Sequence, residues 1–291
     1  MIEGKGFSSL SEGYDENVFL MIHADDAGLC HSENQATMHC LVEGSVNSCS
    51  VMVNCPGFDE MASYLRLNPQ FDHGIHLTLT CEWLDYKFGP VLSHEEVPSL
   101  VDENGNFFRD RKTLLLNAKP EEVRKEVRAQ IHKGLESGLQ PSHIDSHMYS
   151  MGISHEIFDI YREAGKEFDL PVLVNGRLLS EVSGLDPATV LGSSDFQVPN
   201  IHLGHFDLFK EGKLGDFYRE TIENLIPGLH MILIHPAYDD SEMQEITRDH
   251  PNFGSAWRQA DTDFFSSLEC KTLLKDKGVR MIDWKEIRKR L

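Results

Sequence analysis

Acidic and histidine side chains stand where several short apolar runs of the sequence end. Carboxylates and imidazoles in such positions can bind a divalent metal ion or transfer protons. In parallel α/β folds the carboxyl ends of the strands form the face on which ligands bind, so residues far apart in the chain can reach one site. The side chains placed in this way are Asp25, Asp26, His76, His143, His147 and His235.

One carboxylate and two imidazoles, those of Asp26, His76 and His147, form the metal-ligand set that the sequence favours. Such a set suits Zn²⁺, and it suits Mg²⁺ when water completes the coordination shell. An ion held by three side chains keeps a position open, where it can lower the pKa of a water from about 15.7 towards about 7 and polarise a carbonyl. We therefore predict a site for Mg²⁺ or Zn²⁺.

Asp25 and His235 are the predicted catalytic residues. Two adjacent aspartates at a strand end can direct one carboxylate, that of Asp26, to the ion and the other to its water, which makes Asp25 a general base. An imidazole with an ordinary pKa of about 6.5 can donate a proton near neutral pH. His235 is therefore expected to protonate a leaving nitrogen or to stabilise a tetrahedral oxyanion.

Each of these residues also has a purely structural interpretation. An Asp-Asp pair is often a solvated turn, and His76 in an apolar segment could be a hydrogen-bonded core histidine. His143 and His147 could be surface residues, and His235 could bond to the backbone. Coincidence at three successive strand ends explains the pattern less well than a shared metal site does.

Composition and charge indicate the partners and the compartment. The 47 acidic residues outnumber the 27 basic ones, and the formal charge of −20 repels nucleic acid and anionic membranes. No apolar run approaches the roughly 18 residues of a membrane span, and the polar leader at 1–16 lacks the apolar core of a signal peptide, so a cytoplasmic protein is predicted.

The cysteines carry no metal or redox motif. Six are present without a Cys-x-x-Cys pair, so reduced thiols are expected. Cys30 could be a nucleophile, but an incidental buried thiol is the better interpretation, because no histidine and asparagine are arranged to activate it. The chain also lacks a Gly-rich phosphate loop and a Gly-x-Ser-x-Gly elbow.

Strands and helices alternate along the chain and must position these side chains. Short apolar runs typical of buried strands occur at 18–24, 48–54, 73–79, 143–145, 171–174, 231–234 and 279–282. Helices are predicted at 33–42, with Ser32 as N-cap, and at 59–67, 121–136, 153–168, 217–225, 263–275 and the C-terminus.

This alternation continues without a linker, which predicts one α/β domain over 1–291 with a mainly parallel sheet. A single-domain (β/α) barrel, complete, incomplete or distorted, is the preferred architecture. Two stretches, 80–119 and 180–215, are predicted as long irregular loops, which usually cover active sites or carry contacts between subunits.

Four ordered segments, HADDAGLCHSENQA, GSVNSCSVMVNCPGF, GIHLTLT and PSHIDSHMYS, resemble the YdjC-like carbohydrate deacetylase family, which includes the chitooligosaccharide deacetylases. The resemblance covers 19–158 and returns at ILIHPAYD. It implies a (β/α) barrel of the glycoside hydrolase/deacetylase type, often incomplete. It also implies a divalent metal, commonly magnesium or zinc, and hydrolysis of an N-acetyl group from an amino sugar.

Carried over to this chain, the resemblance makes Asp26 a metal ligand and Asp25 the base. The histidine of the Gly-x-His motif is His76, and the second histidine of His-x-Asp-x-His is His147; both are ligands. The first histidine of that motif is His143, which is the reserve ligand.

The chain departs from the family pattern at two places. Ala27 stands where the family usually has phenylalanine, and Tyr149-Ser150 stands where the third motif usually runs on to a further histidine. These departures put the substrate contacts in doubt, whereas the metal set is intact.

Alternative functions remain open on the sequence alone. Another metal-dependent sugar enzyme, an isomerase or a phosphoesterase, would use the same ligands, and a catalytically silent carbohydrate-binding protein would keep the metal only to organise its loops. The expected partner is a small N-acetylated sugar, and a homodimer is an option. The sequence leaves open the length, linkage and phosphorylation of the sugar and the identity of the metal.

Overall fold

The computed structural model describes residues 16–192 and 195–291, so most of the predicted polar leader lies outside the described part of the chain. The strands form one sheet in the order β4-β3-β2-β1-β6-β5, with β7 also paired to β1. Each described strand pair is parallel. The strands are β1 (Val18–Ala27), β2 (Ser48–Val51), β3 (His73–Leu77), β4 (Ile144–Ser146), β5 (Asn200–Leu203), β6 (Gly228–Ile234) and β7 (Arg280–Met281).

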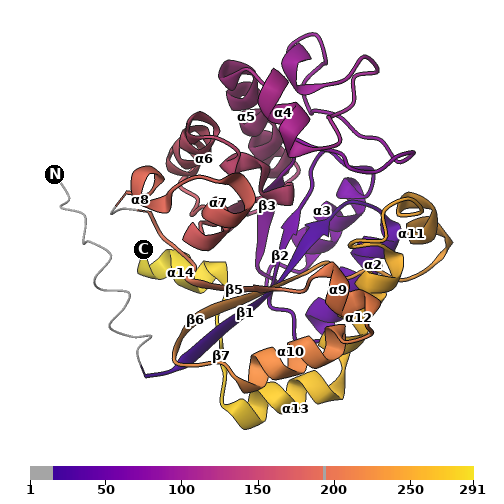
Figure 1. Ribbon diagram of the computed structural model, residues 1–291, viewed down its shortest axis with the longest axis vertical. Coiled ribbons are helices and arrows are strands. Elements are labelled where there is room, and N and C mark those ends of the chain that lie inside the picture. The colour runs from indigo at the N-terminus through magenta and orange to yellow at the C-terminus, as the bar shows by residue number, and fades with distance from the viewer. Residues whose placement is uncertain (1–15, 193–194) are drawn as a thin grey trace.

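Helices surround this sheet, as Figure 1 shows. They are α2 (His31–Val42), α3 (Phe58–Leu67), α4 (Arg111–Asn117), α5 (Pro120–Glu136), α6 (His155–Glu167), α7 (Gly176–Ser183), α8 (Pro187–Val190), α9 (Phe206–Lys210), α10 (Leu214–Glu223), α11 (Ser241–Ile246), α12 (Ser255–Ser266), α13 (Leu268–Lys277) and α14 (Trp284–Arg290). Two 3₁₀ segments, η1 (Pro98–Leu100) and η2 (His147–Gly152), complete the assignment.

The sheet curls into an incomplete barrel, which confirms the predicted single-domain α/β architecture. Its two edges approach each other beyond β4 and before β5, where the Val198 N–H donates to the Val174 carbonyl over 2.9 Å. Strands joined by helical crossovers are expected to run parallel and to bury both faces. The carboxyl ends of all the strands therefore meet on one side of the molecule.

The two faces of the sheet have different contents. In β1, Leu20 and Ile22 belong to the large core that packs against the surrounding helices. Phe19 and Met21 belong to a smaller inner cluster with Trp284 of α14. Because side chains alternate along a strand, the polar residues that follow Met21 at intervals of two also point inward. The interior is therefore apolar near α14 and polar towards the carboxyl ends.

Several predicted boundaries are wrong. The helix predicted at 263–275 is two helices, α12 and α13, which are separated at Ser267. The run at 171–174 contributes only an isolated bridge between Val172 and Ile144. Helix α2 begins at His31 with Cys30 as N-cap, so Ser32 lies inside the helix; its hydroxyl donates to Asp240 and Glu242 instead.

The two stretches predicted as irregular contain regular structure. Residues 80–119 include η1 and α4, and residues 180–215 include α8, β5 and α9. Strand β5 escaped prediction because its sequence, Asn-Ile-His-Leu, alternates polar and apolar residues over only four positions, so the apolar run that marks the other strands is missing; only Ile201 is buried.

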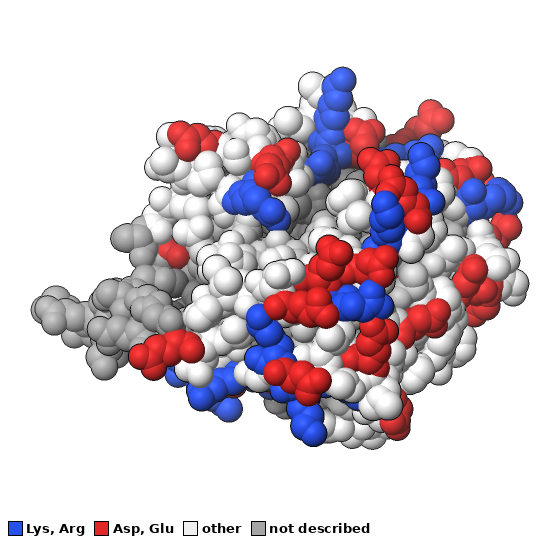
Figure 2. Space-filling view, turned by 60° about the horizontal axis from the view of Figure 1, so that its bottom comes forward, with Lys and Arg blue, Asp and Glu red and all other residues white. Residues whose placement is uncertain are grey.

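The surface bears mixed charges. On the face in Figure 2, the described Lys and Arg side chains stand beside Asp and Glu side chains rather than forming a basic patch of their own. Within the described residues, no helix is both long and apolar enough to cross a membrane.

Candidate metal centre and active site

A β-bulge brings two consecutive aspartates to the same site. Ala24 pairs with Cys49 and Ala27 pairs with Val51, so β1 has one residue more than β2 over this interval. Such a bulge re-aims the side chains of the strand that carries the extra residue. Asp26 adopts a φ of 65°, which non-glycine residues rarely do. This conformation lets neighbouring side chains, which would otherwise face opposite sides of the sheet, reach one pocket.

Asp26, His76 and His147 come together at the carboxyl ends of β1, β3 and β4. Asp26 Oδ1 lies 3.3 Å from His76 Nε2 and 3.0 Å from His147 Nδ1. One ligand atom from each of the three residues lies within 4.8 Å of the others, and all three side chains are buried. This group could hold a metal ion through a carboxylate oxygen and two imidazole nitrogens.

Each of these three side chains has a second polar atom, which points away from the cluster. A buried charged residue bonds to that atom and holds the side chain in place. Asp145 Oδ1 lies 2.8 Å from His76 Nδ1, and Glu82 Oε2 lies 2.9 Å from His147 Nε2. Arg258 donates to Asp26 Oδ2 over 2.8 Å and also to Glu33 over 2.7 Å. Partners of this kind set the orientation of a metal ligand and the tautomer of an imidazole.

The charges around the cluster suit a cation. Burial would lower the pKa of His147, but the charges of Glu82 and Asp26 outweigh it and raise the pKa to about 9. Burial likewise opposes the charged form of Asp26, but His147 and Arg258 hold its pKa well below the ordinary range. The carboxylates therefore attract positive charge to this point, and a divalent ion can replace the protons that the imidazoles carry. The donor set and its field fit a divalent metal.

Asp25 and His235 face each other beside this cluster. His235 Nε2 lies 3.8 Å from Asp25 Oδ2, and the Asp25 side chain is 14% exposed. The His235 ring packs against Phe253 with 4.8 Å between ring centroids. Burial lowers the pKa of His235 to about 4, so the expectation of an ordinary pKa is wrong and the free protein holds this imidazole neutral at pH 7.

All five residues line one cavity of about 340 Å³. Leu178, Leu203 and Phe253 give part of its wall an apolar surface. Arg111 also lines the cavity, and its Nη1 is buried without a hydrogen-bond partner among the described residues. The predicted loops 80–119 and 180–215 thus both contribute to the pocket. Its remaining lining residues include Glu82, Asp145, Ser146, Met148, Tyr149, Leu173, Val182, Leu233, His250, Asn252 and Arg258.

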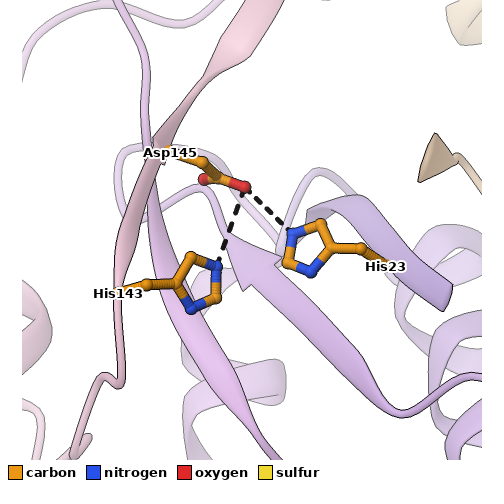
Figure 3. Close-up of side chains that lie close together, drawn as sticks. All are labelled: His23, His143 and Asp145. Carbon is orange, nitrogen blue, oxygen red and sulfur yellow. Dashed lines mark hydrogen bonds and ion pairs between the residues drawn. The ribbon is translucent and has the colours of Figure 1, made fainter. Parts of the chain in front are cut away.

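His143, the reserve ligand, lies apart from the Asp26 cluster. Its ring stacks on Trp284 with centroids 4.8 Å apart, and its Nδ1 bonds to Ser142 Oγ over 2.9 Å. Gly74 makes room for it, because a Cβ at that position would come within 2.5 Å of the ring. The structure therefore groups His143 with His23 and with Asp145, which also lines the pocket (Figure 3). Cys30 is buried, and burial raises its pKa, which does not favour a nucleophile.

Glu82, Arg258 and His23 were not identified from the sequence as residues of the site, and Asp145 was noted only as the middle residue of the His-x-Asp-x-His motif, without a role. His23 precedes Asp25 by two residues, and Asp145 precedes His147 by two, so the two-residue period of a strand could have revealed them. No local pattern predicts Glu82 or Arg258, because Glu82 lies in the stretch 80–119 and Arg258 lies on helix α12 near the C-terminus.

Known proteins are similar to this chain over most of its length. A family model described as YdjC-like protein matches residues 19–276. The carbohydrate deacetylase of Thermoanaerobacter pseudethanolicus is 26% identical over 266 residues, which cover 91% of this chain and 98% of that protein. The chitooligosaccharide deacetylase of Proteus mirabilis is 33% identical over 183 residues, which cover 61% of this chain and 66% of that protein.

A solved structure has the same fold. It is described as a proposed cellobiose-phosphate cleavage protein from Enterococcus faecalis, and it superimposes with a TM-score of 0.77 at 24% identity. The alignment covers 94% of this chain and 99% of that chain. At this identity the likeness concerns the fold.

Proposed function

This chain belongs to the YdjC-like protein family, and from that membership and the geometry of the pocket we propose that it is a divalent-metal-dependent carbohydrate N-deacetylase. Its substrate is an N-acetylated amino sugar or a short oligosaccharide of such sugars, and residues 1–291 act as one catalytic domain. The observation that carries the proposal is the buried group of Asp26, His76 and His147 in the same cavity as Asp25. The names of the two deacetylases reported above agree with it.

Asp26, His76 and His147 would hold the ion, which is Zn²⁺ or Mg²⁺. When bound, the ion supplies a Lewis acid that polarises the amide carbonyl and acidifies water. The protein's contribution is to fix the donor atoms, through Asp145, Glu82 and Arg258, before the substrate arrives.

Asp25 acts as the general base. Its carboxylate is partly exposed within the cavity and is free to accept the proton of a water that attacks the acetamide carbon. The water oxygen forms a bond to that carbon, the C–N bond breaks, and a free amine and acetic acid leave; the acid then releases its own proton to solvent and becomes acetate. The amine needs one proton to depart, and the proton removed from water balances it.

His235 is the donor to the departing nitrogen. Because burial keeps its imidazole neutral in the free protein, the proton that it delivers is one that it receives during the cycle. Asp25 Oδ2 lies 3.8 Å from His235 Nε2, so it can supply the proton once the two side chains move into hydrogen-bond distance. The pair therefore passes one proton from water to the leaving group.

The cavity suits a small sugar. Its volume of about 340 Å³ lies in the range of about 300–1,000 Å³ that is common for small-molecule sites. The apolar part of the wall can pack against a sugar ring or an acetyl methyl group, while the reacting amide faces the charged floor.

Acetate release is the experiment that tests this function. The protein would be incubated with N-acetylated mono- and disaccharides in Mg²⁺, in Zn²⁺ and with a chelator, and acetate would be measured. Metal-dependent acetate release supports a deacetylase. Ketose formation or phosphate release would instead identify an isomerase or a phosphoesterase, and sugar binding without any turnover would identify a silent binding protein.

A further inference from the structure

A buried imidazole that has no part in the chemistry above lies beneath the pocket. His23 is on the inward face of β1 and has no solvent exposure. Its Nε2 lies 2.9 Å from Asp145 Oδ2 and 3.3 Å from Asp25 Oδ1. One ring nitrogen therefore faces two carboxylates that serve the site in different ways, since Asp145 holds a proposed ligand and Asp25 is the proposed base.

The second ring nitrogen of His23 begins a chain of hydrogen bonds that reaches the other end of the barrel. His23 Nδ1 lies 2.9 Å from Ser48 Oγ, and that hydroxyl donates to Asp72 Oδ2 over 2.6 Å. Asp72 also accepts the backbone N–H groups of Trp284 and Lys285, at the start of α14, over 3.2 Å each. The hydrogen bonds thus run without interruption from the pocket to the C-terminal helix.

These contacts define where the protons sit. Because Ser48 gives its one hydroxyl proton to Asp72, it can only accept from His23, so His23 Nδ1 carries a proton. Asp145 Oδ2, at 2.9 Å from Nε2, is an acceptor, so that nitrogen also carries a proton; the Ser50 hydroxyl lies 3.3 Å from the same nitrogen. His23 is therefore a buried cation among carboxylates, and each of its donors has a partner.

Asp145 connects His23 to His76, one of the proposed metal ligands. Its Oδ2 accepts from His23, which leaves Oδ1 for His76 Nδ1 at 2.8 Å. His76 then presents Nε2 to Asp26. Figure 3 shows His23 and His143 on either side of Asp145. The His143 Nε2 atom stands 3.9 Å from Asp145 Oδ2, which is too far for a hydrogen bond.

We propose that His23 is a positioning residue: it fixes the Asp145 carboxylate so that His76 keeps Nδ1–H bonded inward and Nε2 directed at the metal. The inference rests on the proposed function, because it concerns the same site. Without His23, Asp145 would be a buried carboxylate with a free oxygen, and it could rotate or draw water into the interior. The His76 ring would then lose its fixed orientation.

The test replaces His23 and follows His76 directly. His23→Ala removes both donors, and His23→Gln restores one. His230→Gln is the matched control, because His230 is a buried histidine of the neighbouring strand β6 that bonds to Ile226 and His202 instead. Protein labelled with ¹⁵N-histidine gives the Nδ1–H signal of His76, and competition with a chromophoric chelator gives the Zn²⁺ affinity.

We expect a sharp, slowly exchanging His76 Nδ1–H signal in the wild type and in the control. In His23→Ala this signal should broaden or vanish, and Zn²⁺ affinity should fall about 10- to 100-fold, as it does when outer partners of metal ligands are removed. His23→Gln should recover part of both. Urea unfolding of each variant shows whether it is folded. If His23→Ala is not folded, the His76 signal and the Zn²⁺ affinity of His23→Gln are compared with those of the wild type instead.

An unchanged His76 signal and unchanged Zn²⁺ affinity in a folded His23→Ala variant would overturn the proposal, and so would an equal loss in His230→Gln. Failure of the proposed function gives a different result. In that case the wild type releases no acetate from any N-acetylated sugar, while the His76 signal still reports whether His23 positions it.

Discussion

Asp25 and Asp26 are neighbours in the chain but have different surroundings. Asp26 is buried and bonded to His147 and Arg258, so both of its oxygens are engaged by the protein. Asp25 is partly exposed and faces His235 across 3.8 Å. The proposed roles follow this difference: the enclosed carboxylate is the ligand and the accessible one transfers the proton.

Replacing Asp25 tests this division. Asp25→Asn keeps the shape of the side chain but removes the basic carboxylate, so kcat for acetate release should fall by about 10²- to 10⁴-fold, the usual contribution of a general base. Zn²⁺ affinity should stay at the wild-type value, because Asp26 and the imidazoles are untouched. A variant that kept full turnover would remove Asp25 from the role of base.

We expect Arg111 to contact the substrate rather than the metal, because it lines the cavity and is not among the proposed ligands. One of its guanidinium nitrogens is buried in the cavity wall without a partner among the described residues, which is a costly arrangement unless a ligand supplies an acceptor. Arg111→Ala should raise KM about tenfold or more, since a hydrogen bond to a charged group is worth about 1.5–3 kcal/mol. Steady-state kinetics measure this, and Lys112→Ala, at the exposed neighbouring residue, is the control. Equal KM values for Arg111→Ala and Lys112→Ala would show that Arg111 does not contact the substrate.

Residue patterns in the sequence identified part of this site. The apolar runs that end at Asp26, His76 and His147 predicted three side chains that do meet. Glu82 could not be found in that way, because nothing in the stretch 80–119 predicts where a loop side chain will fold back. The low pKa of His235 could not be predicted either, because it results from burial among residues that are distant in the sequence, such as Phe253, which packs against the ring.

Among the elements, helix α12 is tied to the end of β1 through one buried guanidinium. Arg258 bridges Asp26 and Glu33, and all three side chains are almost fully enclosed. Removing one partner from such a group leaves uncompensated buried charge. The link therefore stabilises the fold as well as the site.

Arg258→Met should lower the free energy of unfolding by about 3–5 kcal/mol, the usual cost of breaking a buried ion pair. Urea denaturation in the presence of a chelator measures this without a contribution from bound metal. Arg219→Met is the comparison, because Arg219 pairs with Asp216 and Glu269 at the surface and should cost about 1 kcal/mol or less. Equal losses in the two variants would contradict the account.

Strand β3 begins with a histidine that makes the fold sensitive to acid. His73 Nδ1 donates to the Phe71 carbonyl and Nε2 accepts the Gln140 N–H. Burial lowers the pKa of His73 to about 4, whereas an unfolded histidine has a pKa of about 6.5. Between these values the unfolded chain binds a proton that the folded protein does not, so the free energy of unfolding should fall as pH drops from about 6.5 to about 4.

His73→Gln, which can keep both hydrogen bonds, should make that decline shallower. Urea denaturation of chelated protein at several pH values between 7 and 4.5 measures the slope. Identical slopes for the wild type and the variant would show that other groups cause the loss.

Elements were predictable where the apolar pattern was strong. Strand β1 and helix α5 were located to within a few residues, because a short apolar run that ends at two aspartates marks the strand and a clear amphipathic spacing marks the helix. The break at Ser267 was missed because α12 and α13 both continue a helical pattern, and only the cap formed by the Ser267 hydroxyl on Cys270 N–H reveals the second start.

At the scale of the whole molecule, the parallel topology is what makes the site. Crossovers between parallel strands put every carboxyl end on one side, so β1, β3, β4 and β6 all deliver side chains to one cavity although they span the chain from 18 to 234. The sequence predicted that the strands run parallel, but it did not predict their order, β4-β3-β2-β1-β6-β5. The two edges meet through the hydrogen bond between Val198 and Val174. Val174 lies in an apolar run that was predicted as a strand, whereas Val198 lies in the stretch 180–215 that was predicted as irregular.

Anomalous diffraction from crystals grown with Zn²⁺ measures the central claim directly. The account predicts one strong peak per chain at about 2.0–2.2 Å from an Asp26 oxygen, His76 Nε2 and His147 Nδ1. A strong peak bound elsewhere, with these three side chains turned towards separate parts of the protein, would contradict it.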